Sequence, residues 1–207
     1  MREESVSRPA SAKALRERLA WDPALGRISD GPRRYLLMRP DVLMGAVAAM
    51  APAHRGSFLS SWQMSTCQHG ADSLRAYAQM VQGDRHALLQ ATVAAAADLG
   101  WGRWSVTLEA GTLHLEVLDS PFVGGWLAAS QGRPSQEPVC APIRGMLQAL
   151  AEVVLEGPVA VQEDDCAALQ AQAAHSAELP SAAGHDDRQA LGAAYSCRFT
   201  ARARSAA

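Results

Sequence analysis

The first half of the chain places its apolar residues three and four positions apart, a spacing typical of helices that bury one face. Three helices are predicted from it. One begins at Pro40, where proline suits the first turn, and ends before Pro52. A second spans residues 57–82 as one long helix or one broken at Gly70. A third spans Asp84–Leu99, with its first residue as a plausible N-cap.

The spacing then changes from about 3.6 residues to two. Apolar and polar residues alternate over Trp104–Leu108 and again over Leu113–Leu118. A turn of about four residues, Glu109–Thr112, separates the two segments, and this combination predicts a β-hairpin. Residues 123–138 are rich in Gly, Ser, Gln and Pro, so we expect a loop there, with at most a helical turn around Trp126.

The last part of the chain combines one helix with two strands. Cys140–Leu155 carries a continuous apolar stripe and predicts a helix, after which Val159–Glu163 and Tyr195–Ala201 alternate as strands. Between the strands, residues 167–194 are a low-complexity stretch that we expect to be a solvated insertion, dispensable for folding. Residues 202–207 are expected to form a frayed tail.

Residues 1–30 show no sustained periodicity beyond a short helix over Ser11–Leu19, so we expect a flexible N-terminal arm. Tyr35–Met38 is expected to be a short strand or extended segment that leads into a single domain, residues 31–201. The order of helices, hairpin, helix, strand, insertion and strand predicts an α+β fold, with a helical layer packed on one face of an antiparallel sheet.

Composition narrows the class of protein. The 207 residues are 48% apolar but only 5% aromatic, which favours packed helices over a large sheet, and the net charge of -2 gives no indication of nucleic-acid binding. The polar N-terminal segment lacks the apolar core of a secretory signal, and the apolar stretches are too short for a membrane span. We therefore expect a cytoplasmic protein whose four cysteines are thiols or metal ligands.

Three cysteines and one glutamate form a candidate metal site. Cys140 begins the predicted helix, Cys166 follows one strand, and Cys197 lies in the other. If the strands pair, the last two cysteines meet at one end of the sheet, and Glu163 lies close enough to reach the same ion. Three thiolates and a carboxylate complete a tetrahedral zinc shell with no position left for water. Ordinary buried thiols are the alternative that spacing alone leaves open; Cys67 is expected to be one.

The segment EPVCAPIRGMLQALAEVVLEGPVAVQEDDC, followed by YSCRFTAR, resembles the 4-vinyl reductase domain, which also occurs in hydrocarbon-binding proteins and in the sensors of phenol- and xylene-responsive activators. The resemblance covers residues 100–201 well and implies zinc ligation by Cys140, Glu163, Cys166 and Cys197. Asp119–Phe122 also looks like a segment of the sensor branch. The implied fold is that of transport-particle subunits and NO-signalling ligand-binding domains. The 30 residues between Cys166 and Cys197 depart from the family's short loop.

Aromatic residues gather around the hairpin, although the chain is poor in them. Trp101, Trp104, Phe122 and Trp126 are the candidate ligand-binding residues of an apolar pocket between the helices and the sheet. The alternative is that they are ordinary core residues. His114 alternates with apolar neighbours and is expected to point to the opposite face of the sheet.

Three functions are consistent with these features. The first is a zinc-stabilised domain that binds or senses a small aromatic or hydrocarbon ligand. The second is an enzyme or accessory protein acting on a tetrapyrrole vinyl group, although no cofactor-binding loop is present in the sequence. The third is a dimeric scaffold without ligand. We expect a homodimer whose candidate surface is the apolar segment 40–53, unless that helix packs entirely within its own chain.

Overall fold

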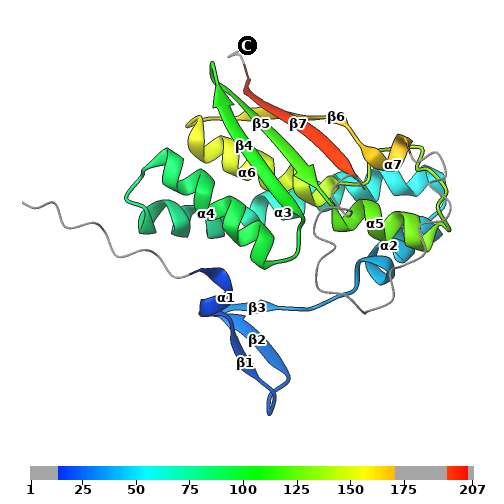
Figure 1. Cartoon of the computed structure of the whole chain (residues 1–207), viewed down its shortest axis with the longest axis horizontal. Helices are drawn as coiled ribbons and strands as arrows, with labels where there is room; N and C mark the ends of the chain where they lie inside the picture. The colour runs from blue at the N-terminus through cyan, green and yellow to red at the C-terminus, as the bar shows by residue number, and fades with distance from the viewer. Residues whose placement is uncertain (1–13, 171–194, 205–207) are drawn as a thin grey trace, which may run out of the picture.

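The hairpin that the alternating pattern predicts is part of a four-stranded sheet in the computed structural model, which describes residues 14–170 and 195–204. The strands are β4 (Arg103–Glu109), β5 (Thr112–Leu118), β6 (Val159–Asp165) and β7 (Ser196–Ala203). They lie in the order β4-β5-β7-β6, and each pairs with its neighbour in antiparallel fashion (Figure 1). The predicted pairing of the strands before and after the insertion is therefore confirmed.

The turn of the hairpin is shorter than expected. Glu109 pairs directly with Thr112, so only Ala110 and Gly111 lie between the strands. Their φ angles are 47° and 76°, and a two-residue turn with positive φ at both positions matches the twist of the strands it joins. Alanine rarely adopts a positive φ, so Ala110 is not a residue type that indicates so short a turn.

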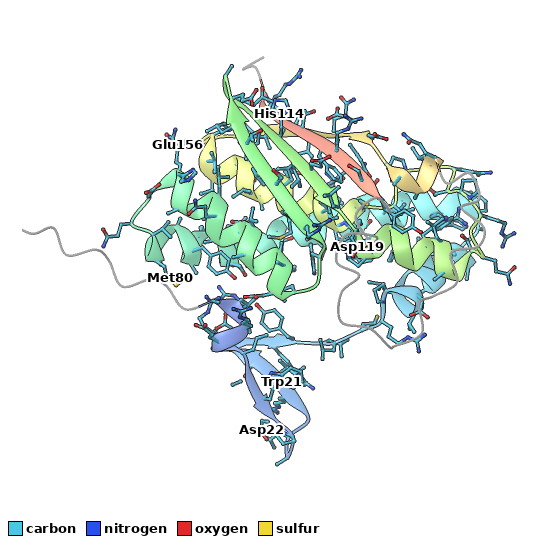
Figure 2. All side chains as sticks on the ribbon, viewed as in Figure 1. Trp21, Asp22, Met80, His114, Asp119 and Glu156 are labelled. Atoms are coloured by element: carbon cyan, nitrogen blue, oxygen red, sulfur yellow. The ribbon has the colours of Figure 1, made fainter. Side chains whose placement is uncertain are left out.

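One face of the sheet is apolar and supports the helices. Leu115 pairs with Phe199 and Val117 with Cys197, and all four side chains are buried. The opposite face carries polar residues, including His114, which Figure 2 shows on the side of the sheet away from the helices. The expected direction of this histidine is confirmed.

The helices cover the apolar face, and the α+β fold is confirmed. Helix α6 packs along β6 and β7, α4 packs against β4, and α3 lies along α6 (Figure 1). The helices of this main body are α2 (Pro40–Ala49), α3 (Pro52–Met80), α4 (Arg85–Asp98), α5 (Pro121–Ala129), α6 (Ala141–Val154) and α7 (Ala167–Gln170). Asp84 caps α4 as predicted, because its side chain accepts a hydrogen bond from the backbone N–H of Ala87.

Of the two alternatives for residues 57–82, the single long helix is confirmed: α3 is one 29-residue helix with no break at Gly70. The prediction for the segment after the hairpin was wrong. Residues 121–129 form α5, although a loop with one helical turn was expected, and its buried side chains are Phe122, Val123, Trp126 and Leu127. The pair Gly124–Gly125 lowers helix propensity, but Gly125 is required by tertiary contact: a Cβ there would lie 2.4 Å from the carbonyl oxygen of Pro40.

Glycines also set how closely α3 and α6 approach. A Cβ on Gly145 of α6 would lie 2.4 Å from the backbone oxygen of Gln63 and 2.9 Å from Thr66 Cβ. A Cβ on Gly70 of α3 would lie 2.4 Å from the sulfur of Met146. Gly70, which looked like a helix break, therefore lies at the contact between α3 and α6.

The N-terminal segment contains more structure than the sequence indicated. Helix α1 (Leu15–Arg18) buries Leu15 in the main core, and β1 (Ala20–Asp22), β2 (Arg27–Asp30) and β3 (Arg33–Tyr35) form a small antiparallel sheet. None of the residues in these three strands is buried, and Figure 1 shows the β1–β2 hairpin projecting from the main body. The expected helix over residues 11–19 lies partly outside the described residues.

The expected insertion begins with ordered structure. Ala167–Gln170 form α7, Ala168 is buried, and its carbonyl oxygen accepts a hydrogen bond from the backbone N–H of Ser135 at 2.7 Å. These four residues are helical and partly packed on the main body, and the solvated insertion stays a prediction. Residues 171–194 lie outside the described residues. No helix within the described part of the chain has the length and hydropathy needed to span a bilayer.

The contact between α3 and α6 yields a stability prediction. Gly145→Ala should lower the free energy of unfolding by about 1–3 kcal/mol, because the added methyl group meets backbone atoms that have no room to move. The matched control is Gly124→Ala in α5, where an added Cβ would meet no atom within 4 Å. That control should leave stability unchanged or raise it by up to about 1 kcal/mol. Urea unfolding of both variants measures the difference; equal midpoints would contradict the close approach.

Candidate metal centre and aromatic residues

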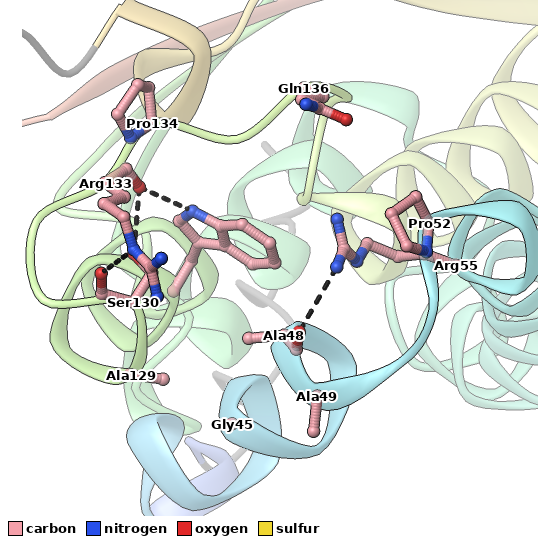
Figure 3. A pocket seen from close by; sticks show the side chains of 11 residues that line it. Gly45, Ala48, Ala49, Pro52, Arg55, Ala129, Ser130, Arg133, Pro134 and Gln136 are labelled. Carbon is pink, nitrogen blue, oxygen red and sulfur yellow. Dashed lines mark hydrogen bonds between the residues drawn. The ribbon is translucent and has the colours of Figure 1, made fainter.

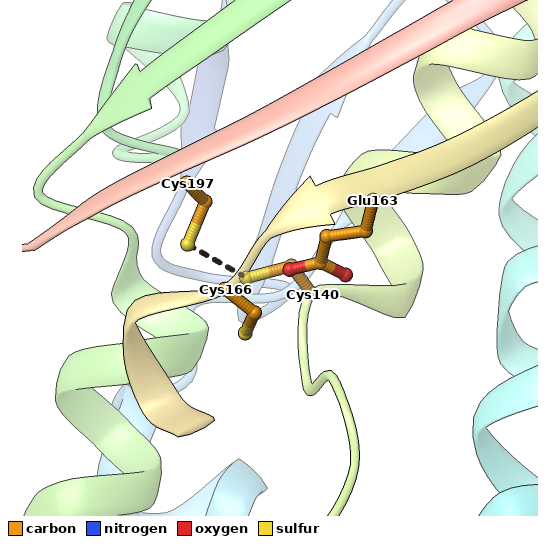
Figure 4. A group of neighbouring side chains, drawn as sticks. All are labelled: Cys140, Glu163, Cys166 and Cys197. Atoms are coloured by element: carbon orange, nitrogen blue, oxygen red, sulfur yellow. Dashed lines mark hydrogen bonds between the residues drawn. The ribbon is translucent and has the colours of Figure 1, made fainter. Parts of the chain in front are cut away.

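The predicted metal ligands converge from four parts of the fold. Cys140 is the N-cap of α6, Glu163 lies on β6, Cys166 follows that strand, and Cys197 lies on β7. Their ligand atoms all lie within 4.8 Å of one another (Figure 4). The four residues are therefore close enough to hold one metal ion, as the sequence predicted.

The spacing of two of the sulfur atoms fits a tetrahedral metal site. Cys140 Sγ and Cys197 Sγ lie 3.8 Å apart. A tetrahedral site with zinc–sulfur bonds of about 2.3 Å separates its sulfur atoms by about 3.8 Å. All four cysteines in the described residues are free, so no disulfide competes for these atoms.

The carboxylate of Glu163 lacks the hydrogen bonds that a buried charged group needs. The Glu163 side chain is 1% exposed, yet neither carboxylate oxygen has a hydrogen-bond partner among the described residues. Burial raises its pKa to about 9, and the charge of Cys166 adds to the effect. A buried carboxyl group without a hydrogen-bond partner is costly, and a metal ion would satisfy both its charge and its lone pairs.

The thiols share protons in the metal-free cluster. The pKa of Cys197 is lowered to about 4 because its sulfur accepts hydrogen bonds from Cys140 and Cys166. The pKa of Cys140 is raised well above its ordinary value by its hydrogen bonds with Cys166 and Cys197 and by burial. The cluster thus favours one thiolate beside neutral partners. A metal ion would replace the remaining protons, because thiolates and carboxylates bind metals in their deprotonated forms.

Three further groups surround the ligands. The Ser120 hydroxyl lies 3.4 Å from Cys140 Sγ, and the backbone N–H of Ala167 donates to Cys197. Arg144 Nε lies 3.8 Å from the Glu163 carboxylate and offsets part of the negative charge of the donor set. Such neighbours orient metal ligands and adjust their basicity. Sequence reasoning noted Ser120 only through the Asp119–Phe122 segment, and Arg144 was missed.

The four aromatic candidates fall into two groups. Trp101 contacts Trp104 and Phe122, with ring centroids 6.5 and 5.6 Å apart. Phe122 also contacts Trp62 of α3, at 5.7 Å, which the sequence analysis had not included. Trp126 is outside this chain of rings and lines a cavity of about 500 Å³ between α2 and α5. Whether any of the four contacts a ligand stays a prediction.

Comparison with solved structures shows the same fold in a known sensor. The chain resembles the phenol-responsive sensory domain of the transcription activator PoxR, whose crystal structure was solved with phenol. The TM-score is 0.66 at 16% sequence identity, and the match covers 91% of this chain and 86% of that domain. At this identity the likeness concerns the fold. No family model and no curated protein matches the sequence, so membership of the 4-vinyl reductase family stays an expectation.

Proposed function

We propose that this chain is a zinc-stabilised domain that binds and senses a small aromatic or hydrocarbon molecule in the cytoplasm. The observation that carries the proposal is the fold it shares, over 91% of its length, with a sensory domain that responds to phenol. The free cysteines are consistent with a reducing compartment. No feature of the described residues favours the tetrapyrrole enzyme or the ligand-free scaffold, and these stay predictions.

Zinc is the metal that the donor set favours. Three thiolates with one carboxylate are typical of a closed, four-coordinate zinc site, which supports folding and leaves no position for a reacting water. Cys140, Glu163, Cys166 and Cys197 would hold the ion, and Ser120 and Arg144 would fix the orientation of two of them. Bound zinc would supply folding free energy by joining α6 to β6 and β7.

A cysteine replacement tests the zinc site. Cys166→Ser should reduce zinc content from one equivalent per chain to nearly none. It should also lower the free energy of unfolding by at least about 2.7 kcal/mol, which is the stabilisation that bound zinc gives when free zinc is at 100 times its Kd. The control is Cys67→Ser on α3, a half-buried thiol outside the cluster, which should keep one zinc. Native mass spectrometry and thermal melts provide both values. Equal zinc content in the two variants would refute the assignment.

Ligand binding can be tested on zinc-loaded protein by intrinsic tryptophan fluorescence. Phenol and small aromatic acids should quench or shift the emission with a saturable dependence at micromolar to millimolar concentration, because aromatic candidates lie in or next to the expected site. Cyclohexanol of similar size serves as the non-aromatic comparison. If isothermal titration calorimetry also detects no binding of any aromatic compound, the sensing function fails and only the metal claim remains.

We also propose a homodimer, with a surface that differs from the expected one. Within segment 40–53, Met44 and Val47 are buried in their own chain, where α2 packs on α5. Exposed apolar residues lie just before and on the outer side of this helix: Leu36 (78% exposed), Leu37 (72%), Met38 and Val42. A second copy of the chain would cover this patch by two-fold symmetry.

The dimer proposal predicts a mass change in light scattering. Leu36→Asp combined with Leu37→Asp should convert a dimer into a monomer without loss of zinc, because a charge at the centre of an apolar interface is left unpaired. Leu108→Asp, at an exposed leucine of β4 on the edge of the sheet, should remain dimeric. A wild-type protein with the mass of a single chain would rule out this interface.

A further inference from the structure

The cavity that contains Trp126 has a chemical character that the proposed function does not specify. It lies between the C-terminal half of α2, the first turn of α3 and the end of α5 (Figure 3). One wall is made of Gly45, Ala48 and Ala49, which leave about 500 Å³ of space beside the indole ring. This volume is in the usual range for small-molecule sites.

A buried arginine forms part of the cavity. Arg55 is only 8% exposed, and its guanidinium lies 5.0 Å from the centre of the Trp126 ring. Its Nε donates to the carbonyl oxygen of Val47, and its Nη2 donates to the carbonyl oxygens of Ala48 and Met50. These bonds hold the guanidinium rigidly at the C-terminal end of α2. No carboxylate of the described chain forms an ion pair with it.

A second arginine stands at the rim of the same cavity. Arg133 is exposed, and its Nε donates to the carbonyl oxygen of Ser130 at 2.9 Å. Its own carbonyl oxygen accepts hydrogen bonds from Trp126 Nε1 at 3.0 Å and from Ser130 Oγ at 2.9 Å. The loop after α5 is therefore fastened to the indole ring that faces the cavity. Among the described residues that line the cavity none is acidic, and two are arginines, of which Arg55 lies over the indole ring.

We infer that this cavity binds a small aromatic carboxylate, of the size and charge of benzoate. Arginine matches a carboxylate in charge and in planar geometry, and a buried, pre-positioned guanidinium loses little entropy when it binds one. The Trp126 face and the small apolar wall would receive the aromatic ring. A neutral phenol or hydrocarbon would leave both cations without a counter-charge. This inference rests on the proposed function only in taking the ligand to be aromatic.

The test compares benzoate with its neutral analogue, benzamide, by calorimetry on zinc-loaded wild-type protein. Benzoate should bind at least tenfold more tightly than benzamide. Arg133→Gln should reduce benzoate affinity about tenfold and leave benzamide affinity unchanged, because it removes one cation from an exposed position. Arg202→Gln, at an exposed arginine of β7 away from the cavity, is the matched control and should bind benzoate like the wild type. Trp126→Leu should weaken benzoate binding as well.

Two outcomes would overturn the inference and leave the sensing function intact. One is phenol or benzamide binding as tightly as benzoate. The other is benzoate binding that neither Arg133→Gln nor Trp126→Leu weakens, which would place the ligand elsewhere. Failure of every aromatic compound to bind the wild-type protein would instead remove the sensing function together with the inference.

Discussion

The packing of α6 on both of its sides is the constraint on which the other parts of the structure depend. One face of this helix buries Ile143, Leu147 and Leu150 in the core beside the sheet, while Gly145 lets α3 approach on another side without room for a methyl group. Because α6 is held in this way, its N-terminus has a fixed position relative to β6 and β7. Cys140 stands at that N-terminus, so the geometry of the metal centre follows from helix packing rather than from a local loop.

Without an ion, the arrangement of the metal centre costs folding free energy. It buries a carboxyl group with no hydrogen-bond partner beside three thiols, one of which favours the thiolate form. Such a cluster would be more stable as plain apolar packing if it had no ligand to bind. With a divalent cation, its charges would be paired, and Arg144 would balance part of the remaining negative charge. The same four residues are therefore costly when empty and stabilising when occupied, a behaviour typical of structural metal sites.

Regular patterns predicted the elements well, whereas features that depend on contacts between distant residues were missed. The stripe of α6 and the alternation in β4 to β7 were sufficient because one face of each element is buried. Gly70 and Gly125 each look like helix breakers locally, so a break at the first stayed an alternative and a loop was expected around the second, while their real role is a close approach to Met146 and to Pro40. Likewise, sequence proximity placed Trp126 with Trp101, but Trp126 lies about one turn of α5 beyond Phe122 and lines a different cavity.

Helix α5 connects the two proposed sites. It begins directly after Ser120, whose hydroxyl contacts the sulfur of Cys140, and it ends at the loop that holds Arg133 beside Trp126. The nine residues of α5 are all that separate Ser120, which contacts Cys140, from Ser130, which lines the cavity. Within so short a helix, a shift of the first turn moves the last, because the hydrogen-bonded backbone behaves as a nearly rigid rod. Replacing Cys140 would therefore remove the contact that Ser120 makes just before the first turn of α5, and a ligand affinity measured on that variant would report this loss as well as the properties of the cavity.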